Sequence, residues 1–98
     1  MTGFETGQDV GVRATIFRGP FPDESMVSIV TPSGQITGFV SNSHIDQTDE
    51  NNSYVRAVIQ SIEGDEITIL LAGSFFTTAG LATLPTGWAR ENLALAEV

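Results

Sequence analysis

The single histidine of the chain, His44, lies among hydroxyl and carboxylate side chains. Ser41 and Ser43 precede it and Asp46 follows it, all within three positions. Hydrolases use a serine, a histidine and an aspartate as nucleophile, base and orienting group. Side chains this close in sequence point in different directions from one turn, whereas such triads are assembled from distant parts of a fold. We therefore interpret this segment as a polar corner whose side chains cap a turn, and we predict a protein that is not an enzyme and has no catalytic residue.

Residues 46–53 are the most polar stretch and supply carboxylate oxygens, which are the ligands that Ca²⁺ prefers. Asp46, Asp49 and Glu50 fall in this stretch, but their spacing lacks the Asp-x-Asp-x-Asp-Gly pattern of a calcium loop. The chain has no cysteine, which excludes disulfides and thiolate metal sites. We expect no metal, no cofactor and a solvated loop between two units, with a bound cation as the alternative for this loop.

The net charge of the chain is −8, from twelve acidic residues and four arginines, and there is no lysine. A GC-rich coding sequence would use arginine in place of lysine; salt adaptation or avoidance of lysine modification is the alternative. A surface this negative repels phosphate backbones, so we expect no direct binding of nucleic acid. No apolar run approaches the ~18 residues of a membrane span, and the N-terminus lacks the features of a signal peptide. We expect no membrane partner and a cytoplasmic or virion-associated protein.

A short pattern recurs in the chain. Residues 12–16, Val-Arg-Ala-Thr-Ile, return 43 positions later as residues 55–59, Val-Arg-Ala-Val-Ile. Each copy is followed by an apolar alternation, a glycine-containing turn, a third strand-like run and a polar or proline-containing corner. We predict pseudo-repeats at about 10–46 and 54–96. Neither is long enough to bury a core alone, so we expect one domain over residues 1–98.

Period-two alternation of apolar residues predicts most of the secondary structure. No segment of ten or more residues shows a helical period. The fold class is therefore all-β, a small barrel of about six strands made from two fused three-stranded units. Short helical turns are expected near 41–46 and 86–92, the second capped by Thr86. The expected strands cover residues 10–16, 26–30, 35–40, 54–61, 66–71, 75–78 and 81–84, with a short strand and a glycine turn over 4–10 and a final edge strand near 93–95.

Residues 34–45, Gly-Gln-Ile-Thr-Gly-Phe-Val-Ser-Asn-Ser-His-Ile, resemble the end of a Src-homology-3-type small barrel. In that superfamily a Gly-x-x-Gly-aromatic strand runs into a Pro-Ser-Asn-Tyr-Val corner. The opening Phe-x-x-Gly-x-Asp-Val-x-Val of residues 4–12 is similar to its first strand. The resemblance implies a fold and no function. Ser41 and His44 stand where the family has proline and tyrosine, so we do not expect a proline-rich ligand.

The aromatic residues give the strongest indication of a contact surface. Phe75 and Phe76 are adjacent in a predicted strand, so one of them faces away from the core. Phe21 lies between two prolines in a loop, where burial is difficult to arrange. Trp88, at the closing corner, is either a lid on the core or a binding anchor. Since exposed aromatic residues mark protein interfaces, we predict Phe21, Phe75, Phe76 and Trp88 as interface residues.

Arg13 and Arg56 occupy matching places in the two repeats, each between two inward-pointing apolar residues. We expect both on the outer face, paired with acidic residues of a neighbouring strand. A paired contact of the two arginines across a pseudo-symmetric barrel is the alternative.

These observations favour a non-catalytic interaction or structural module that self-associates or docks on a larger assembly through exposed aromatic residues and free strand edges. Small acidic, lysine-free proteins of this shape resemble accessory products of actinobacterial or phage genomes, virion components among them. The alternative is an acidic inhibitor that presents carboxylates in place of nucleic-acid phosphates to a basic protein partner. High salt separates the two, because screening weakens only the second.

Overall fold

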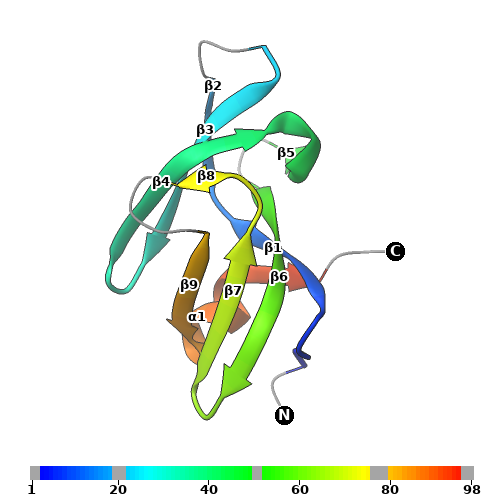
Figure 1. The fold of residues 1–98 in the computed structure, drawn as a ribbon. Helices are drawn as coiled ribbons and strands as arrows, with labels where there is room; N and C mark the ends of the chain where they lie inside the picture. The colour runs from blue at the N-terminus through cyan, green and yellow to red at the C-terminus, as the bar shows by residue number, and fades with distance from the viewer. Residues whose placement is uncertain (1–2, 19–21, 50–51, 76–79, 96–98) are drawn as a thin grey trace.

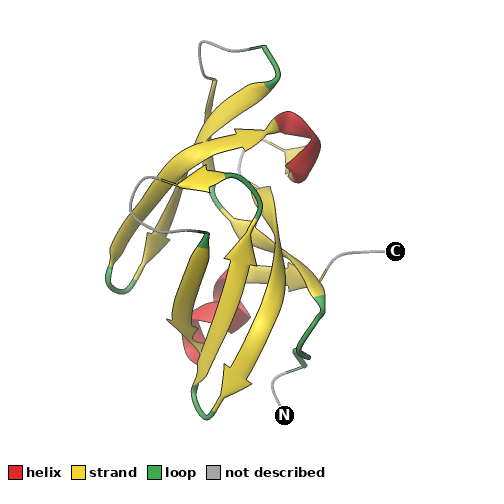
Figure 2. Cartoon of the chain, in the orientation of Figure 1, coloured by secondary structure: helices red, strands yellow, loops and turns green. Residues whose placement is uncertain are grey.

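The computed structural model describes residues 3–18, 22–49, 52–75 and 80–95, and most of these residues lie in strands, with two short helical segments (Figure 2). The elements are, in chain order, β1 (Asp9–Arg13), β2 (Thr15–Arg18), β3 (Glu24–Thr31), β4 (Gly34–Ser41), η1 (Asn42–His44), β5 (Ile45–Asp49), β6 (Asn52–Glu63), β7 (Glu66–Leu71), β8 (Ser74–Phe75), β9 (Leu81–Pro85), α1 (Thr86–Asn92) and β10 (Leu93–Leu95). The all-β class is confirmed, as are the two short helical segments.

The strands form two antiparallel sheets (Figure 1). The first sheet has the order β10-β1-β6-β7-β9, with β5 paired to β6 beside this path, and the second has the order β2-β3-β4-β8. The described residues thus form ten strands, not the expected six or so. The difference arises where one expected strand divides and where polar segments pair as short strands.

The expected strand over 10–16 divides at Ala14. β1 lies in the first sheet and β2 in the second, and between them the Ala14 amide donates a hydrogen bond to the Ser53 carbonyl, 3.0 Å away. The period-two pattern continues through this crossing because both strands keep their apolar residues toward the same core. Periodicity therefore gives no sign that the chain has changed sheets.

The expectation of a solvated loop over 46–53 is wrong for the residues of this range that the structure describes, because residues 45–49 form β5 and pair with β6. Ile45 packs against the core, whereas Asp46 and Gln47 are exposed. Polar side chains on an outer strand face water while the backbone pairs normally, so polarity alone does not distinguish this strand from a loop.

Two smaller expectations are also corrected. Residues 4–8 form a turn and not a strand, and Gly7 has a φ of +85°. A hydrogen bond from the Gly7 amide to the Ile59 carbonyl, 2.7 Å long, holds this turn against β6. Thr86 does not cap α1, whose N-cap residue is Pro85 with no side-chain cap bond. Thr86 instead lies buried in the first turn, where its amide donates to the Asp65 carbonyl at 2.7 Å.

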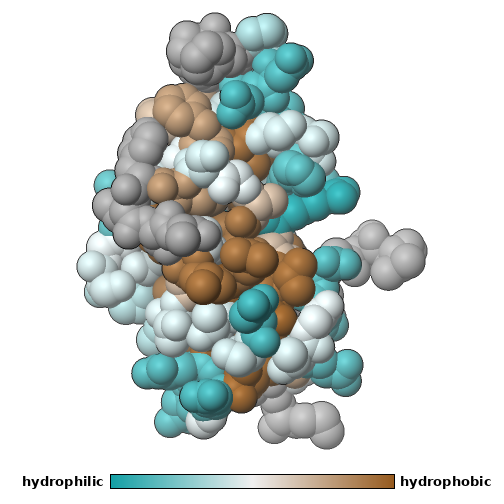
Figure 3. All heavy atoms as spheres, in the orientation of Figure 1, coloured by the Kyte–Doolittle hydropathy of each residue, from teal (hydrophilic) through white to brown (hydrophobic). Residues whose placement is uncertain are grey.

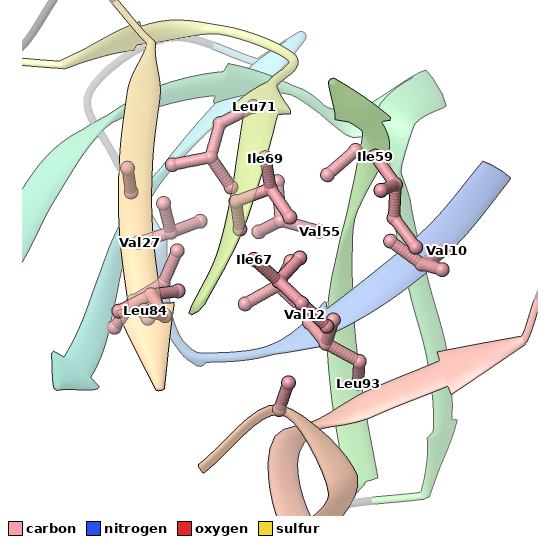
Figure 4. Packing of buried hydrophobic residues seen from close by; sticks show 14 of the residues in the cluster. Val10, Val12, Val27, Val55, Ile59, Ile67, Ile69, Leu71, Leu84 and Leu93 are labelled. Carbon is pink, nitrogen blue, oxygen red and sulfur yellow. The ribbon is translucent and has the colours of Figure 1, made fainter. Parts of the chain in front are cut away.

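One hydrophobic core lies between the sheets and under α1 (Figure 4). β-Branched residues dominate it, as expected for strands buried on one face. Inward residues of both sheets and of the helix contribute to the same cluster. The core residues are Val10, Val12, Val27, Ile29, Val40, Val55, Ala57, Ile59, Ile67, Ile69, Leu71, Ala82, Leu84, Ala89 and Leu93.

β1 and β6 each have a short strand beside them, β10 and β5, and the register of the two pairings is equivalent. β1 and β6 pair with each other at Val12 and Val55. Ile45 of β5 pairs with Val55, and Leu93 of β10 pairs with Val12. The last strand of each predicted repeat therefore lies on the first strand of the other. This is the register that two equivalent units related by a two-fold axis would have.

The remaining strands of the two predicted repeats also correspond to each other in register. Thr15, Ser28 and Thr37 are register partners across β2, β3 and β4. In the second half of the chain, the matching register partners across β6, β7 and β9 are Val58, Leu70 and Leu81.

Candidate protein-interaction surface

The corner around His44 is organised by its neighbours. His44 is exposed at the end of η1, and the hydroxyls of Ser41 and Ser43 lie 3.0 Å apart. The Asn42 side chain accepts a hydrogen bond from the Ser25 hydroxyl at 2.7 Å and donates one to the Pro22 carbonyl at 3.2 Å. These contacts join η1 to the start of β3 and so shape the turn.

Arg56 pairs with an acidic residue of the neighbouring strand, as expected. Its Nε atom lies 3.4 Å from Asp46 Oδ2, and the two side chains are 61% and 55% exposed. A pair this exposed contributes about 0–1 kcal/mol to stability. Arg13 is exposed, and no acidic group of the described residues lies within ion-pair distance of it. Nor does the described part of the chain bring three metal-ligating side chains together.

The four predicted interface residues have different surroundings. Phe21 and Phe76 lie outside the described residues. Phe75, in β8, is half-buried against the core and pairs in register with Gly38 of β4. Trp88, in α1, is half-buried against the same core, and its indole N–H donates to the Val30 carbonyl at 3.0 Å. Trp88 therefore covers the core and connects the helix with the second sheet.

Replacing Trp88 by phenylalanine is expected to lower the free energy of unfolding by about 1 kcal/mol, because the Val30 carbonyl loses its donor. Urea denaturation followed by circular dichroism measures the change. Val30→Ser keeps the carbonyl and removes only a 63%-exposed side chain, so it is the matched control and should cost less than about 0.5 kcal/mol. A Trp88→Phe protein as stable as the original would contradict the role of this bond.

A row of aliphatic side chains crosses the outer face of the first sheet. We call Val58, Leu70 and Leu81 the apolar row; they are register partners on β6, β7 and β9. Leu70 and Leu81 are 40% and 46% exposed, and Val58 is half-buried. The pleat turns them away from the core, into which their neighbour Ile69 points. Figure 3 shows hydrophobic residues gathered at the centre of this face.

The apolar row has a polar border whose hydrogen bonds are satisfied. Thr68 and Thr83 form the next register pair toward the β6–β7 hairpin, and their hydroxyls lie 2.9 Å apart. A hydrophobic centre with a polar rim is the usual composition of a protein–protein contact.

Formal charge on this face lies beside the apolar row and not within it, since Asp9 of β1 is the register partner of Val58 and exposed Arg56 precedes Val58 by two positions on β6. Residues 67–89, a run of 23 that includes β9 and all of β7 except Glu66, contain no Asp, Glu, Lys or Arg. Residues 25–45, at the corresponding place in the first half of the chain, are likewise uncharged. The sixteen charged residues all lie outside these two runs. This distribution was visible in the sequence and is the signal that could have located the apolar row.

The apolar row is not required by the fold. In the matching register positions of the second sheet the chain has Thr15, Ser28 and Thr37. Equivalent strands therefore pair and pack with hydroxyl side chains at these outward positions. The remaining large exposed apolar residues of the described chain, Phe17 and Val30, lie on the second sheet.

The chain matches no protein-family model, no curated protein and no solved structure. Among the helical residues that the structure describes, no segment is long and apolar enough to cross a membrane.

Proposed function

We propose that the protein is a non-catalytic interaction module that docks through the apolar row. The supporting observation is the contrast between two equivalent sets of positions. Leu70 and Leu81 are exposed where the other half of the chain has Ser28 and Thr37. Because the fold accepts hydroxyl groups there, leucines that remain in contact with water are explained by a partner that covers them.

The apolar row is an anchor and not a whole interface. Full burial of a leucine is worth about 1.5–3 kcal/mol. Since Leu70 and Leu81 are already more than half covered, a partner gains on the order of 2 kcal/mol from the two together. Neighbouring groups such as the Thr68–Thr83 pair supply the remaining contact area and its polar boundary. A row of this size suits a small module held within a larger assembly, such as a virion.

We also propose the Src-homology-3-like relationship as the origin of the fold. A paired strand, a short helical segment and a further strand follow one another as β4, η1 and β5, and again as β9, α1 and β10. This order supports a small-barrel unit used twice. It supports no particular ligand.

Site-specific photo-crosslinking in the host cell tests the docking proposal. We expect p-benzoylphenylalanine at Leu70 to form a discrete covalent adduct with a protein, and Leu81→Thr in the same chain to abolish it. The same photoreactive residue at Thr37, in β4 of the second sheet, is the matched control and should give none. Equal adducts at both positions, or none at Leu70, would contradict docking through the apolar row.

A further inference from the structure

We infer that the docking partner adds an extended segment to the first sheet as a further antiparallel strand beside β9, and that this segment belongs to a different protein. The inference rests on the proposed function, because it describes how the partner of the apolar row binds. Addition of a strand to a sheet edge is a general mode of peptide recognition. Leu81 belongs both to the apolar row and to β9, so a strand added at this edge lies directly beside the row.

β9 corresponds to β4 in the other half of the chain, and the ends of the two strands match in detail. Each strand is followed by a helical segment whose N-cap residue has the same conformation, with φ −58° and ψ 137° at Ser41 and φ −61° and ψ 143° at Pro85. The next residue, Asn42 or Thr86, donates its amide to the carbonyl of the residue before the paired strand, at 2.8 Å and 2.7 Å. Residues 44 positions apart are therefore equivalent along β4 and β9.

Only β4 has a second neighbouring strand among the residues that the structure describes. It pairs with β3 on one side and, at Gly38 and Phe39, with β8 on the other. β9 pairs with β7 and is the last strand of the first sheet (Figure 1). The difference arises from the connections, because β3 reaches β4 through residues 32–33, whereas β7 reaches β9 through residues 72–80, which include β8. The second half of the chain thus supplies a strand to the first half, and the described part of the first half supplies none in return.

The backbone of Thr83 faces the open side of β9. The Gly80 carbonyl and the Thr86 amide, which flank the strand, each form a 2.7 Å hydrogen bond with the backbone on the β7 side. Because alternate residues of an antiparallel strand direct their backbone groups to the same neighbour, Ala82 also faces β7 and Thr83 faces away from it. Thr83 is equivalent to Phe39, the residue of β4 whose outward backbone is in register with β8.

β9 lacks the features that usually protect a sheet edge from further pairing. Protected edges carry charged side chains, bulges or prolines within the strand. β9 has no charged residue, and its pairing with β7 has no bulge. Pro85 ends the strand, beyond the two residues that correspond to Gly38 and Phe39 of β4. The part of β9 that is equivalent to the β8-binding part of β4 is therefore able to pair.

The register of β8 on β4 defines the side chains that suit an added strand. In the same register, one residue of the partner lies opposite Ala82 and faces the core, as Phe75 does opposite Gly38. The following residue lies beside Leu81 and continues the apolar row on the outer face. Two consecutive apolar residues within an extended segment therefore fit this edge.

A second copy of the chain cannot place its own β8 here in the same way. A Cβ added at Gly38 would lie 2.7 Å from Phe75 Cα, so β8 lies closer to β4 than any residue but glycine allows. Ala82 carries a Cβ at the equivalent position of β9. In addition, β8 is already paired with β4 in each copy. The occupant is therefore a segment of a different protein, at the ordinary strand spacing of about 4.8 Å from β9.

Photo-crosslinking in the host cell, with p-benzoylphenylalanine at Leu70, tests the inference. We expect Thr83→Pro to lower the yield of the adduct at least 10-fold, because proline has no amide to donate to an added strand. Proline is tolerated on edge strands where the lost amide faces outward, so the variant should keep the circular dichroism of the original protein. Thr83→Val is the matched control. It removes the same hydroxyl, keeps the amide and should leave the adduct unchanged.

Amide hydrogen exchange makes the same test without a substitution at the edge, and it decides the question if Thr83→Pro does not fold. In the free chain the Thr83 amide should exchange quickly and the Ala82 amide slowly. In the covalent complex with the protein captured at Leu70, the Thr83 amide should exchange at least 100-fold more slowly than in the free chain.

A folded Thr83→Pro chain that keeps the Leu70 adduct would overturn strand addition and leave the docking proposal standing. A Thr83 amide that exchanges equally fast in the free chain and in the complex would have the same meaning. An adduct of twice the monomer mass would identify a second copy as the occupant and would also overturn the inference. The absence of any adduct from a chain with an unchanged edge would remove both proposals.

Discussion

Replacing Ile69 by alanine is expected to lower the free energy of unfolding by about 2–5 kcal/mol. The side chain is 1% exposed and lies at the centre of the core between the two sheets (Figure 4). Alanine removes buried methyl and methylene groups and leaves a cavity that the surrounding strands close only in part. Since a small domain has about 5–15 kcal/mol of stability in total, this one change removes a large fraction of it. Urea denaturation followed by far-ultraviolet circular dichroism measures the loss.

The next residue in the chain is the control for this prediction. Leu70 loses the same kind of side chain on replacement by alanine, but it is 40% exposed on the opposite face of β7. We expect Leu70→Ala to cost less than about 1 kcal/mol. Similar losses for Ile69→Ala and Leu70→Ala would mean that the register of β7 is displaced by one residue, because such a slip exchanges the two faces.

Gly73→Ala is expected to destabilise the protein by about 3 kcal/mol or more. Gly73 lies at the corner between β7 and β8, where the chain passes from the first sheet to the second. Its φ is +122°, a conformation that residues with a side chain rarely adopt. An added Cβ would also lie 2.7 Å from Val40 Cγ2 and 2.8 Å from the Phe39 carbonyl oxygen. Conformational strain and steric overlap therefore act together at this position.

Gly64, in the β6–β7 hairpin, separates these two effects. It has a φ of +57° and open space where a Cβ would be placed. Gly64→Ala introduces backbone strain alone and should cost about 1–2 kcal/mol. Thermal and chemical denaturation of both variants provides the comparison. Equal losses at Gly64 and Gly73 would contradict close packing of the β7–β8 corner against β4.

The strands were predictable from the sequence where apolar alternation and turn residues agree. Thr31 and Gly34 bound the tight β3–β4 turn, where the Thr31 hydroxyl donates to the Gly34 carbonyl at 2.7 Å. The bounds of α1 were also predicted, although the cap expected from Thr86 is wrong, because Pro85 is the N-cap residue and Thr86 lies inside the helix. In these places local chemistry and tertiary packing favour the same conformation.

The proposed interaction surface was not predictable by the same reasoning. Leu70 stands between Ile69 and Leu71, so three consecutive apolar residues conceal which one faces outward. Only pairing with Val58 on one side and Leu81 on the other shows that it continues a line across three strands. Sequence reasoning instead selected aromatic residues by type. Of these, Phe75 and Trp88 are half-buried against the core, a location set by contacts distant in sequence.

The pairing of β5 with β6 and of β10 with β1 bears on how the protein loses its structure. If one half of the chain unfolded, the first strand of the other half would lose a paired strand. The backbone amides and carbonyls of that first strand would then be exposed to water. A species with one half ordered and the other denatured is therefore strongly disfavoured. The molecule is built to denature in a single cooperative step, although its chain contains two similar segments.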